Sequence, residues 1–170
     1  MIIFLLHFCQ WVDSTRLSAV LRQSTWMFPA LDVIHTLGIV LVAGTIMLVD
    51  LRLLGLTLRS EPAAGVIERI VPWTLWGFAL MFVTGALLFC SEAVKLFHSP
   101  AFRIKLVILA LAGLNALIFH QTIYRDVANW DQAAAAPVRA RLAGLLSLAF
   151  WIATIAAGRA IAYGANYDLG

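Results

Sequence analysis

Four stretches of this chain are long and apolar enough to cross a lipid bilayer. Asp, Glu, Lys and Arg are absent from all four, which cover residues 33–49, 70–91, 106–124 and 142–158. A helix needs about 17–25 residues to cross roughly 30 Å of hydrocarbon. Lipid tolerates only helices or closed barrels, and these runs lack the alternation of a barrel strand. The sequence therefore predicts four membrane-spanning helices.

The composition supports a membrane protein and excludes several function classes. Hydrophobic residues make up 62% of the 170 residues and charged residues 12%, whereas soluble domains average about 45–50% and about 25%. The sequence contains no phosphate-binding glycine loop, nucleophile elbow or zinc-protease signature, and no basic arm suited to nucleic acid. We therefore expect lipid as the main partner, no nucleic-acid binding, and no recognisable catalytic centre.

The predicted architecture is all-α: one integral membrane domain over 1–170, folded as a four-helix up-down bundle. We place its spans at about 28–50, 70–92, 102–124 and 140–162. Four prolines lie at or just before these starts, where a missing N–H costs little: Pro29, Pro72, Pro100 and Pro137. Ser99 is a predicted N-cap for the third span. Pro62 is expected to open a short helix within the first loop.

The first 24 residues are predicted to form an amphipathic helix along the membrane interface. Its lipid-facing side would carry Trp11, Leu17, Val20 and Leu21, and its water-facing side Asp13, Arg16 and Arg22. The six tryptophans are expected to form interfacial belts: Trp11, Trp26, Trp73, Trp76, Trp130 and Trp151.

Orientation follows from the twelve Lys and Arg residues, which divide evenly between the two sides. Lys105 and Arg159 are expected within the edge of the membrane. When these two residues are left out, the side that carries the loops between spans has more Lys and Arg residues than the side that carries the termini. The positive-inside rule then predicts cytoplasmic loops and external or periplasmic termini.

A polar pocket is predicted in the half of the membrane that faces the termini. Charged groups there are expensive in hydrocarbon unless they are paired, so we expect them to face one another. The residues are Asp32, His35, Glu92, Lys95, Lys105 and Arg159. In this hypothesis Lys105 and Arg159 hold an anionic group, Asp32 and Glu92 are their partners, and His35 titrates. Interfacial anchoring by the long Lys and Arg side chains is the alternative.

A second polar layer is expected in the opposite half. Its members are Asp50, Arg52, Thr74, His120, Gln121, Arg125 and Asp126. Asp50 and Arg52 are interpreted as residues flanking a helix end, and His120 as a ring bonded to Thr74 or to a backbone carbonyl. Asn115, near the middle of its span, must find a hydrogen-bond partner.

Metal and haem sites are the remaining hypotheses from the residues. With about 1.5 Å of rise per residue, His35 and His120 lie about 18 Å apart in depth and cannot share one haem iron. Each haem would then need a second ligand from elsewhere. Soft ligands for copper are Cys9, Cys90, His7, His35, His98, Glu92, Met47 and Met81. A disulfide between Cys9 and Cys90 is a further alternative.

Several short runs resemble a family of small bacterial four-helix membrane proteins without an assigned function. They are IHTLG at 34–38, DLRLLG at 50–55, PWT at 72–74, SEAVK at 91–95, NALIFH at 115–120 and AGR at 157–159. More remotely, the chain is similar to the membrane part of CopD-type copper-resistance proteins and to cytochrome b561-like bundles. The first likeness implies copper passage. The second implies haem b and quinone-linked electron transfer at His35 and His120.

Three functional hypotheses follow. The first is a redox-linked protein of the bacterial inner membrane that binds haem b or quinone, with His35, His120, Lys105 and Arg159 as cofactor-binding residues. Asp32, Glu92, Asn115 and Asp50 would then form its polar network, and the two histidines would serve as metal ligands. The second is a copper or small-solute transporter. The third is an accessory subunit of a larger membrane complex, or a homo-oligomer, whose polar residues fix helix register.

Overall fold

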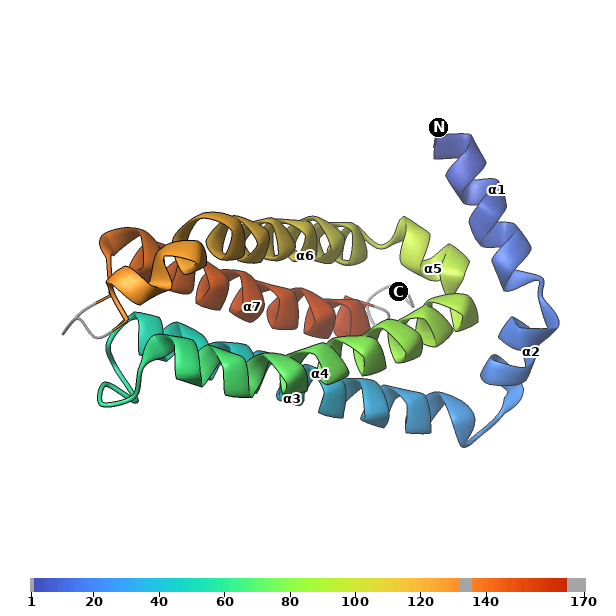
Figure 1. The fold of residues 1–170 in the computed structure, drawn as a ribbon. Coiled ribbons are helices and arrows are strands. Elements are labelled where there is room, and N and C mark those ends of the chain that lie inside the picture. The colour runs from blue at the N-terminus through green and yellow to red at the C-terminus, as the bar shows by residue number, and fades with distance from the viewer. Residues whose placement is uncertain (1, 132–135, 165–170) are drawn as a thin grey trace.

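The computed structural model of the protein describes residues 2–131 and 136–164, and this part of the chain is helical without any strand. The elements in chain order are α1 (Ile2–Asp13), α2 (Arg16–Gln23), α3 (Met27–Leu53), α4 (Ala63–Ser91), α5 (Ala93–His98), α6 (Pro100–Ile118), the π-helical turn η1 (Phe119–Ile123), the 3₁₀ turn η2 (Tyr124–Asn129) and α7 (Val138–Gly164). The long helices run up and down alongside one another (Figure 1).

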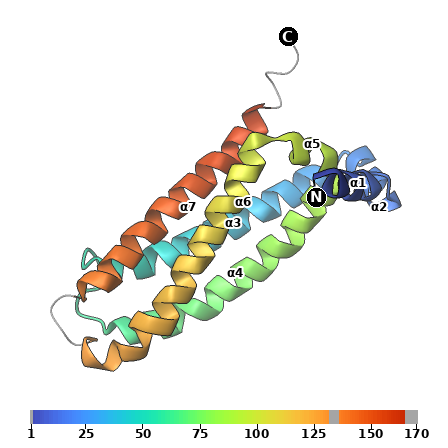
Figure 2. The same ribbon diagram turned by 90° about the horizontal axis from the view of Figure 1, so that it is seen from above.

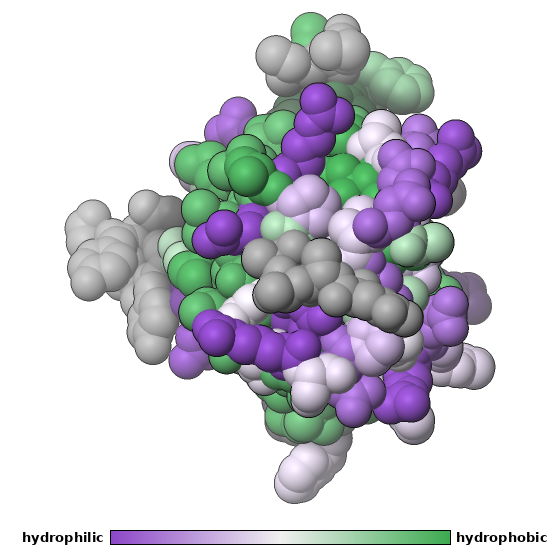
Figure 3. Space-filling model, turned by 60° about the vertical axis from the view of Figure 1, so that its left-hand side comes forward, coloured by the Kyte–Doolittle hydropathy of each residue, from purple (hydrophilic) through white to green (hydrophobic). Residues whose placement is uncertain are grey.

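The predicted fold class is confirmed. Among the described residues, four helices are long and apolar enough to span a membrane, and they comprise α3, α4, the α6 segment with its two terminal turns, and α7. Their flanks expose large apolar side chains such as Val107, Leu114 and Ile152, which is the surface that lipid covers. Hydrophilic side chains gather at the end of the bundle that carries the interhelical loops (Figure 3). The protein is a multi-pass membrane protein.

Two of the four prolines were predicted to lie at the starts of α6 and α7, and the structure agrees with both predictions. Ser99 caps α6 by accepting a hydrogen bond from the Phe102 amide (3.3 Å), with Pro100 in the first helical position. Pro137 directly precedes α7. Both prolines occupy positions where no backbone donor is needed.

The start of α4 differs from the prediction. The helix begins at Ala63, so Pro62 caps the spanning helix itself and does not open a separate one, and Pro72 lies within the helix. The reason is a long-range cap: an Asp131 carboxylate oxygen, beyond η2, accepts a hydrogen bond from the Ala64 amide (2.9 Å). An acidic group is favourable at a helix N-terminus, where amides are unpaired and the dipole is positive.

The four long helices form an open arc in the order α4, α3, α7, α6. The backbone of α3 contacts α4 and α7, and α7 contacts α6, but α4 and α6 do not approach each other along their described lengths. Figure 1 shows α7 between α6 and α4, and Figure 2, seen from above, shows α6 in front of α3. The rings of Phe89 and Phe102 stack across this gap near the termini, with centroids 5.9 Å apart. The arc therefore has one open side.

Close contact between α3 and α4 depends on two glycines. A Cβ atom at Gly77 would lie 2.6 Å from Val42 Cγ2, and one at Gly38 would lie 2.9 Å from Met81 Cγ. Contacts this short do not occur between carbon atoms, so each helix needs a residue without a side chain where its neighbour crosses. Small residues at helix crossings are the usual means of close packing in membranes.

The N-terminal segment is two helices and not one interfacial helix. α1 lies beside α5 at the end of the bundle that carries the termini, and α2 connects it to α3 (Figure 1). Trp11, Leu17 and Val20 are exposed as expected, but Leu21 is fully buried because α2 packs against α3 and α4. An ion pair from Arg22 to Asp13 (3.0 Å) holds the turn between the two helices.

The Gly77 contact gives a stability prediction. Gly77→Ala should lower the free energy of unfolding by about 1–3 kcal/mol, because the added methyl group overlaps Val42 and forces the helices apart. Gly44→Ala is the matched control, since nothing lies within 4 Å of its added Cβ and alanine favours a helix. Thermal unfolding in detergent measures both variants. Equal melting temperatures would contradict this account of the α3–α4 contact.

Candidate functional site

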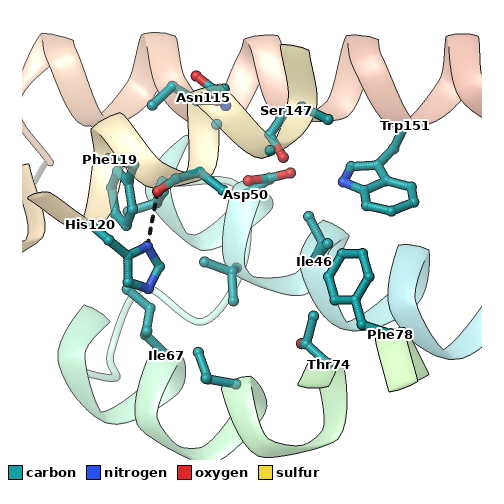
Figure 4. A pocket seen from close by; sticks show the side chains of 18 of the residues that line it. Ile46, Asp50, Ile67, Thr74, Phe78, Asn115, Phe119, His120, Ser147 and Trp151 are labelled. Atoms are coloured by element: carbon teal, nitrogen blue, oxygen red, sulfur yellow. Dashed lines mark hydrogen bonds between the residues drawn. The ribbon is translucent and has the colours of Figure 1, made fainter. Parts of the chain in front are cut away.

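A cavity of about 310 Å³ lies among all four long helices, in the half of the bundle away from the termini. Figure 4 shows side chains from each helix directed toward it. Most of its lining is apolar, including Ile46, Ile67, Val71, Phe78, Leu109, Phe119 and Trp151. A small set of polar groups interrupts this lining: Asp50, Thr74, Asn115, His120 and Ser147. An apolar pocket with a few placed polar groups is the usual form of a small-molecule site.

Asp50 is the most unusual residue of the cavity. It lies in the last turn of α3 with only 4% of its surface exposed, and a hydrogen bond joins its carboxylate to Ser147 on α7. Its Oδ2 atom is buried and has no partner among the described residues. Gly144 allows this approach of the two helices, since a Cβ there would lie 3.2 Å from the Asp50 carbonyl oxygen.

Two other polar side chains of the cavity lining, Thr74 and Asn115, are paired. Thr74 on α4 donates to Thr45 Oγ1 on α3 (2.9 Å), and His120, for which Thr74 was one of two predicted partners, bonds to the other, a backbone carbonyl. The Asn115 amide donates to the Ala143 carbonyl (3.0 Å) and joins α6 to α7. The prediction that Asn115 needs a partner is therefore confirmed. Within the cavity lining, Asp50 therefore stands out by its unpaired oxygen; elsewhere among the described residues, Ser18 Oγ and Thr154 Oγ1 are also buried without a partner.

His120 lies at the outer side of the cavity, within the π-helical turn η1. Its Nδ1 donates to the Ala116 carbonyl (3.2 Å) (Figure 4), in agreement with one of the two predicted bonds. A carbonyl oxygen only accepts, so Nδ1 carries the proton and the neutral ring keeps Nε2 as an acceptor. Single π turns within helices are frequent at functional sites because they redirect side chains.

The cavity opens sideways toward lipid. Leu75 and Phe78 of α4 line it and are 62% and 41% exposed, and Gly113 of α6 lines it from the other side of the gap. Trp151 packs against Phe78, with ring centroids 5.9 Å apart, and closes the cavity toward the termini. At 7% exposure, Trp151 belongs to the core and not to an interfacial belt as predicted.

In the half that faces the termini, His35 occupies a polar contact between α3 and α4. Thr84 donates its hydroxyl proton to the Leu80 carbonyl (2.7 Å), so it accepts from His35 Nδ1 at 2.8 Å. The neutral ring therefore keeps Nε2 as its acceptor. Gly85 makes room for the ring, since a Cβ there would lie 3.2 Å from His35 Cε1.

The predicted pocket around His35 is assembled only in part. Lys105 and Asp32 both lie within electrostatic range of His35, and Lys105 Nζ is 3.5 Å from the position of a Cβ on Gly158, next to Arg159. Glu92, however, pairs with Lys95 (2.8 Å) near the surface and is not the partner of Lys105. Asp32 is exposed. The cavity lies in the other half of the bundle, where the sequence predicted a second polar layer but no pocket.

The part of the chain that the structure describes contains no group of three or more His, Cys, Asp or Glu side chains that could hold a metal ion. His35 and His120 lie in opposite halves and bond to Thr84 and Ala116. The separation predicted for the two histidines therefore holds, and they do not face a common iron.

Sequence comparison places the chain in a family. Residues 8–164 match a family of unknown function, DUF6644. The chain belongs to the DUF6644 family. This agrees with the resemblance to a family without an assigned function. No curated protein and no solved structure matches the chain.

Two polar residues of this DUF6644 protein were not predicted from the sequence: Ser147, which lines the cavity, and Thr45, which accepts the hydrogen bond of Thr74 in the lining. Ser147 and Thr45 look like ordinary small residues of apolar spans, and nothing in their neighbours along the sequence distinguishes them. Asp50 was found but was assigned to a helix end because Arg52 follows it. The sequence does contain a feature that could have identified Asp50 as a site residue: it directly follows an uncharged run. An ionisable group at such a position is a functional candidate by default.

Because one carboxylate oxygen of Asp50 is buried without a partner, we expect this residue to lower the stability of the ligand-free protein. Asp50→Leu should raise the free energy of unfolding by about 1 kcal/mol, because it replaces a buried carboxylate that has one unpaired oxygen with an apolar group of similar size. Asn115→Leu, which removes a satisfied amide, should lower it by about 1 kcal/mol. Thermal unfolding of ligand-free protein measures both. A destabilised Asp50→Leu variant would mean that the carboxylate serves the fold.

Proposed function

We propose that this protein binds a lipid-soluble molecule of the quinol class in the cavity among α3, α4, α6 and α7. The observation that carries the proposal is the buried Oδ2 of Asp50, which lacks a partner among the described residues and belongs to a cavity that opens toward lipid. A buried acceptor without a partner is costly. A ligand that supplies a hydroxyl donor removes this cost.

A quinol matches the other features of the cavity. Its aromatic ring suits an apolar lining that includes Phe78, Phe119 and Trp151, because aromatic rings pack well against one another. Its two hydroxyl groups lie at opposite ends of the ring. Asp50 and His120 Nε2 offer acceptors on two sides of the cavity (Figure 4). The lateral opening allows the ligand to enter from the bilayer, where such molecules are dissolved.

The proposed role is redox-linked. Oxidation of a quinol releases two protons and two electrons, and Asp50 and His120 are the groups placed to receive the protons. The two electrons need an acceptor, and we propose that a haem or iron–sulfur centre in a second membrane subunit accepts them one at a time. The geometry favours quinol over haem b, because His35 and His120 do not face one another and each iron would need a further ligand.

The proposed location is the bacterial inner membrane with periplasmic termini. The end of the bundle away from the termini carries Arg59 in the α3–α4 loop and five arginines in the helix ends and turns beside the loops: Arg52, Arg69, Arg125, Arg139 and Arg141. Such residues favour the cytoplasmic side. Lys105 and Arg159 would then hold anionic groups, such as lipid phosphates, in the outer half.

Equilibrium binding of a labelled short-chain benzoquinol to protein in lipid nanodiscs tests the proposal. The Asp50→Leu variant should bind the quinol about tenfold to a hundredfold more weakly, because it loses a hydrogen bond to a carboxylate worth about 1.5–3 kcal/mol. Asp32→Leu, an exposed carboxylate on the same helix, is the control and should bind like the natural protein. The oxidised quinone should bind more weakly than the quinol, because it brings no donor to Asp50.

A second variant tests the location of the quinol site while Asp50 stays unchanged. Gly113 lines the cavity, and an added Cβ would meet no atom within 4 Å. Gly113→Leu should therefore fill the cavity and abolish quinol binding while the protein stays folded. Equal quinol affinity in the natural protein, Asp50→Leu and Gly113→Leu would contradict the proposed site.

A further inference from the structure

The chain contains two cysteines, and the fold brings them into one apolar cluster. Cys9 lies in α1 and Cys90 near the end of α4, far apart in the sequence. The buried members of the cluster are Cys9, Val12 and Ala93, and Cys90 packs against it together with Phe89, Val94 and Phe97. Both side chains are free thiols in this structure. The cluster lies at the end of the bundle that carries the termini, away from the cavity.

The position of α1 places Cys9 beside the end of α4 that carries Cys90. α1 contacts α5 and the end of α4, while its other side is open, with Phe4, Phe8 and Trp11 exposed. A disulfide requires Cα atoms about 4.4–6.8 Å apart. A helix held on one side by an apolar contact can shift into this range more easily than a helix in the core, because little packing is lost.

We propose that Cys9 and Cys90 form a reversible intramolecular disulfide that fastens α1 to the end of α4. The oxidant is a small or protein disulfide, which accepts the two electrons. One thiol attacks this disulfide, forms a mixed disulfide and releases the first reduced thiol. The second cysteine then attacks the mixed disulfide, forms the Cys9–Cys90 bond and releases the other reduced thiol.

The two cysteines have different roles in this exchange. Cys9 is 5% exposed, and burial raises the pKa of its thiol, which lowers its thiolate fraction and its access to an oxidant. Cys90 is only half-buried. Cys90 therefore reacts first with the oxidant, and Cys9 resolves the mixed disulfide from within the cluster. The consequence is an N-terminal helix that is tied to the bundle under oxidising conditions and held by packing alone when reduced.

Oxidation of the purified full-length protein with glutathione disulfide tests the proposal. Intact mass after alkylation of the remaining thiols should show a monomer that has lost two hydrogen atoms and takes up no alkylating reagent. Cys9→Ser should accumulate one glutathione on Cys90, because the resolving thiol is missing. Cys90→Ser should react more slowly than Cys9→Ser. Both changes are nearly isosteric, and gel filtration confirms that the variants are folded.

Hydrogen exchange provides a second readout. Oxidation should slow amide exchange in α1 of the natural protein and leave α1 of Cys9→Ser unchanged. Two glutathiones on the natural protein, thiols that still alkylate after exhaustive oxidation, or a disulfide between two chains on a non-reducing gel would each overturn the proposal. None of these measurements depends on quinol binding, so the two proposals succeed or fail separately.

Discussion

The placement of α3 between α4 and α7 determines the rest of this structure. Gly38 and Gly77 bring α3 close to α4, and Gly144 lets α7 approach the last turn of α3 at Asp50. α6 packs against α7 and does not reach α4. Four helices arranged in this way cannot close on all sides, and the space between α4 and α6 becomes a cavity that faces lipid. The cavity therefore results from which helices carry the small residues.

The chemistry of the cavity follows from what the fold leaves unpaired. Inside a membrane protein each polar group needs a partner within the protein or from a ligand. Thr45, Thr74 and Asn115 find theirs across the helix contacts. Asp50 finds only part of its hydrogen-bonding capacity in Ser147. A protein that retains such a group gives up stability, which is common at binding sites. The proposed ligand supplies the missing donor.

The sequence predicts the membrane-spanning helices well and the cavity poorly. Individual residues show why. Charge-free runs and Ser99 locate the helices because burial in lipid and N-capping are local properties. The start of α4 depends on Asp131, which is distant in sequence. The charges near the termini suggested a deep pocket, but Glu92 pairs with Lys95 near the surface and Asp32 is exposed. Asp50 and Trp151 are buried by contacts with helices that only the fold brings near.

Photo-crosslinking with an azido-quinol in native-like bilayers tests the central claim most directly, namely that the cavity takes its ligand from the lipid. The account predicts adducts on the residues that flank the opening, Leu75 and Phe78 on α4 and Gly113 and Ala116 on α6, and their loss when unlabelled quinol competes. Adducts spread over lipid-facing positions such as Ile104 and Ile152, unaffected by competition, would contradict it.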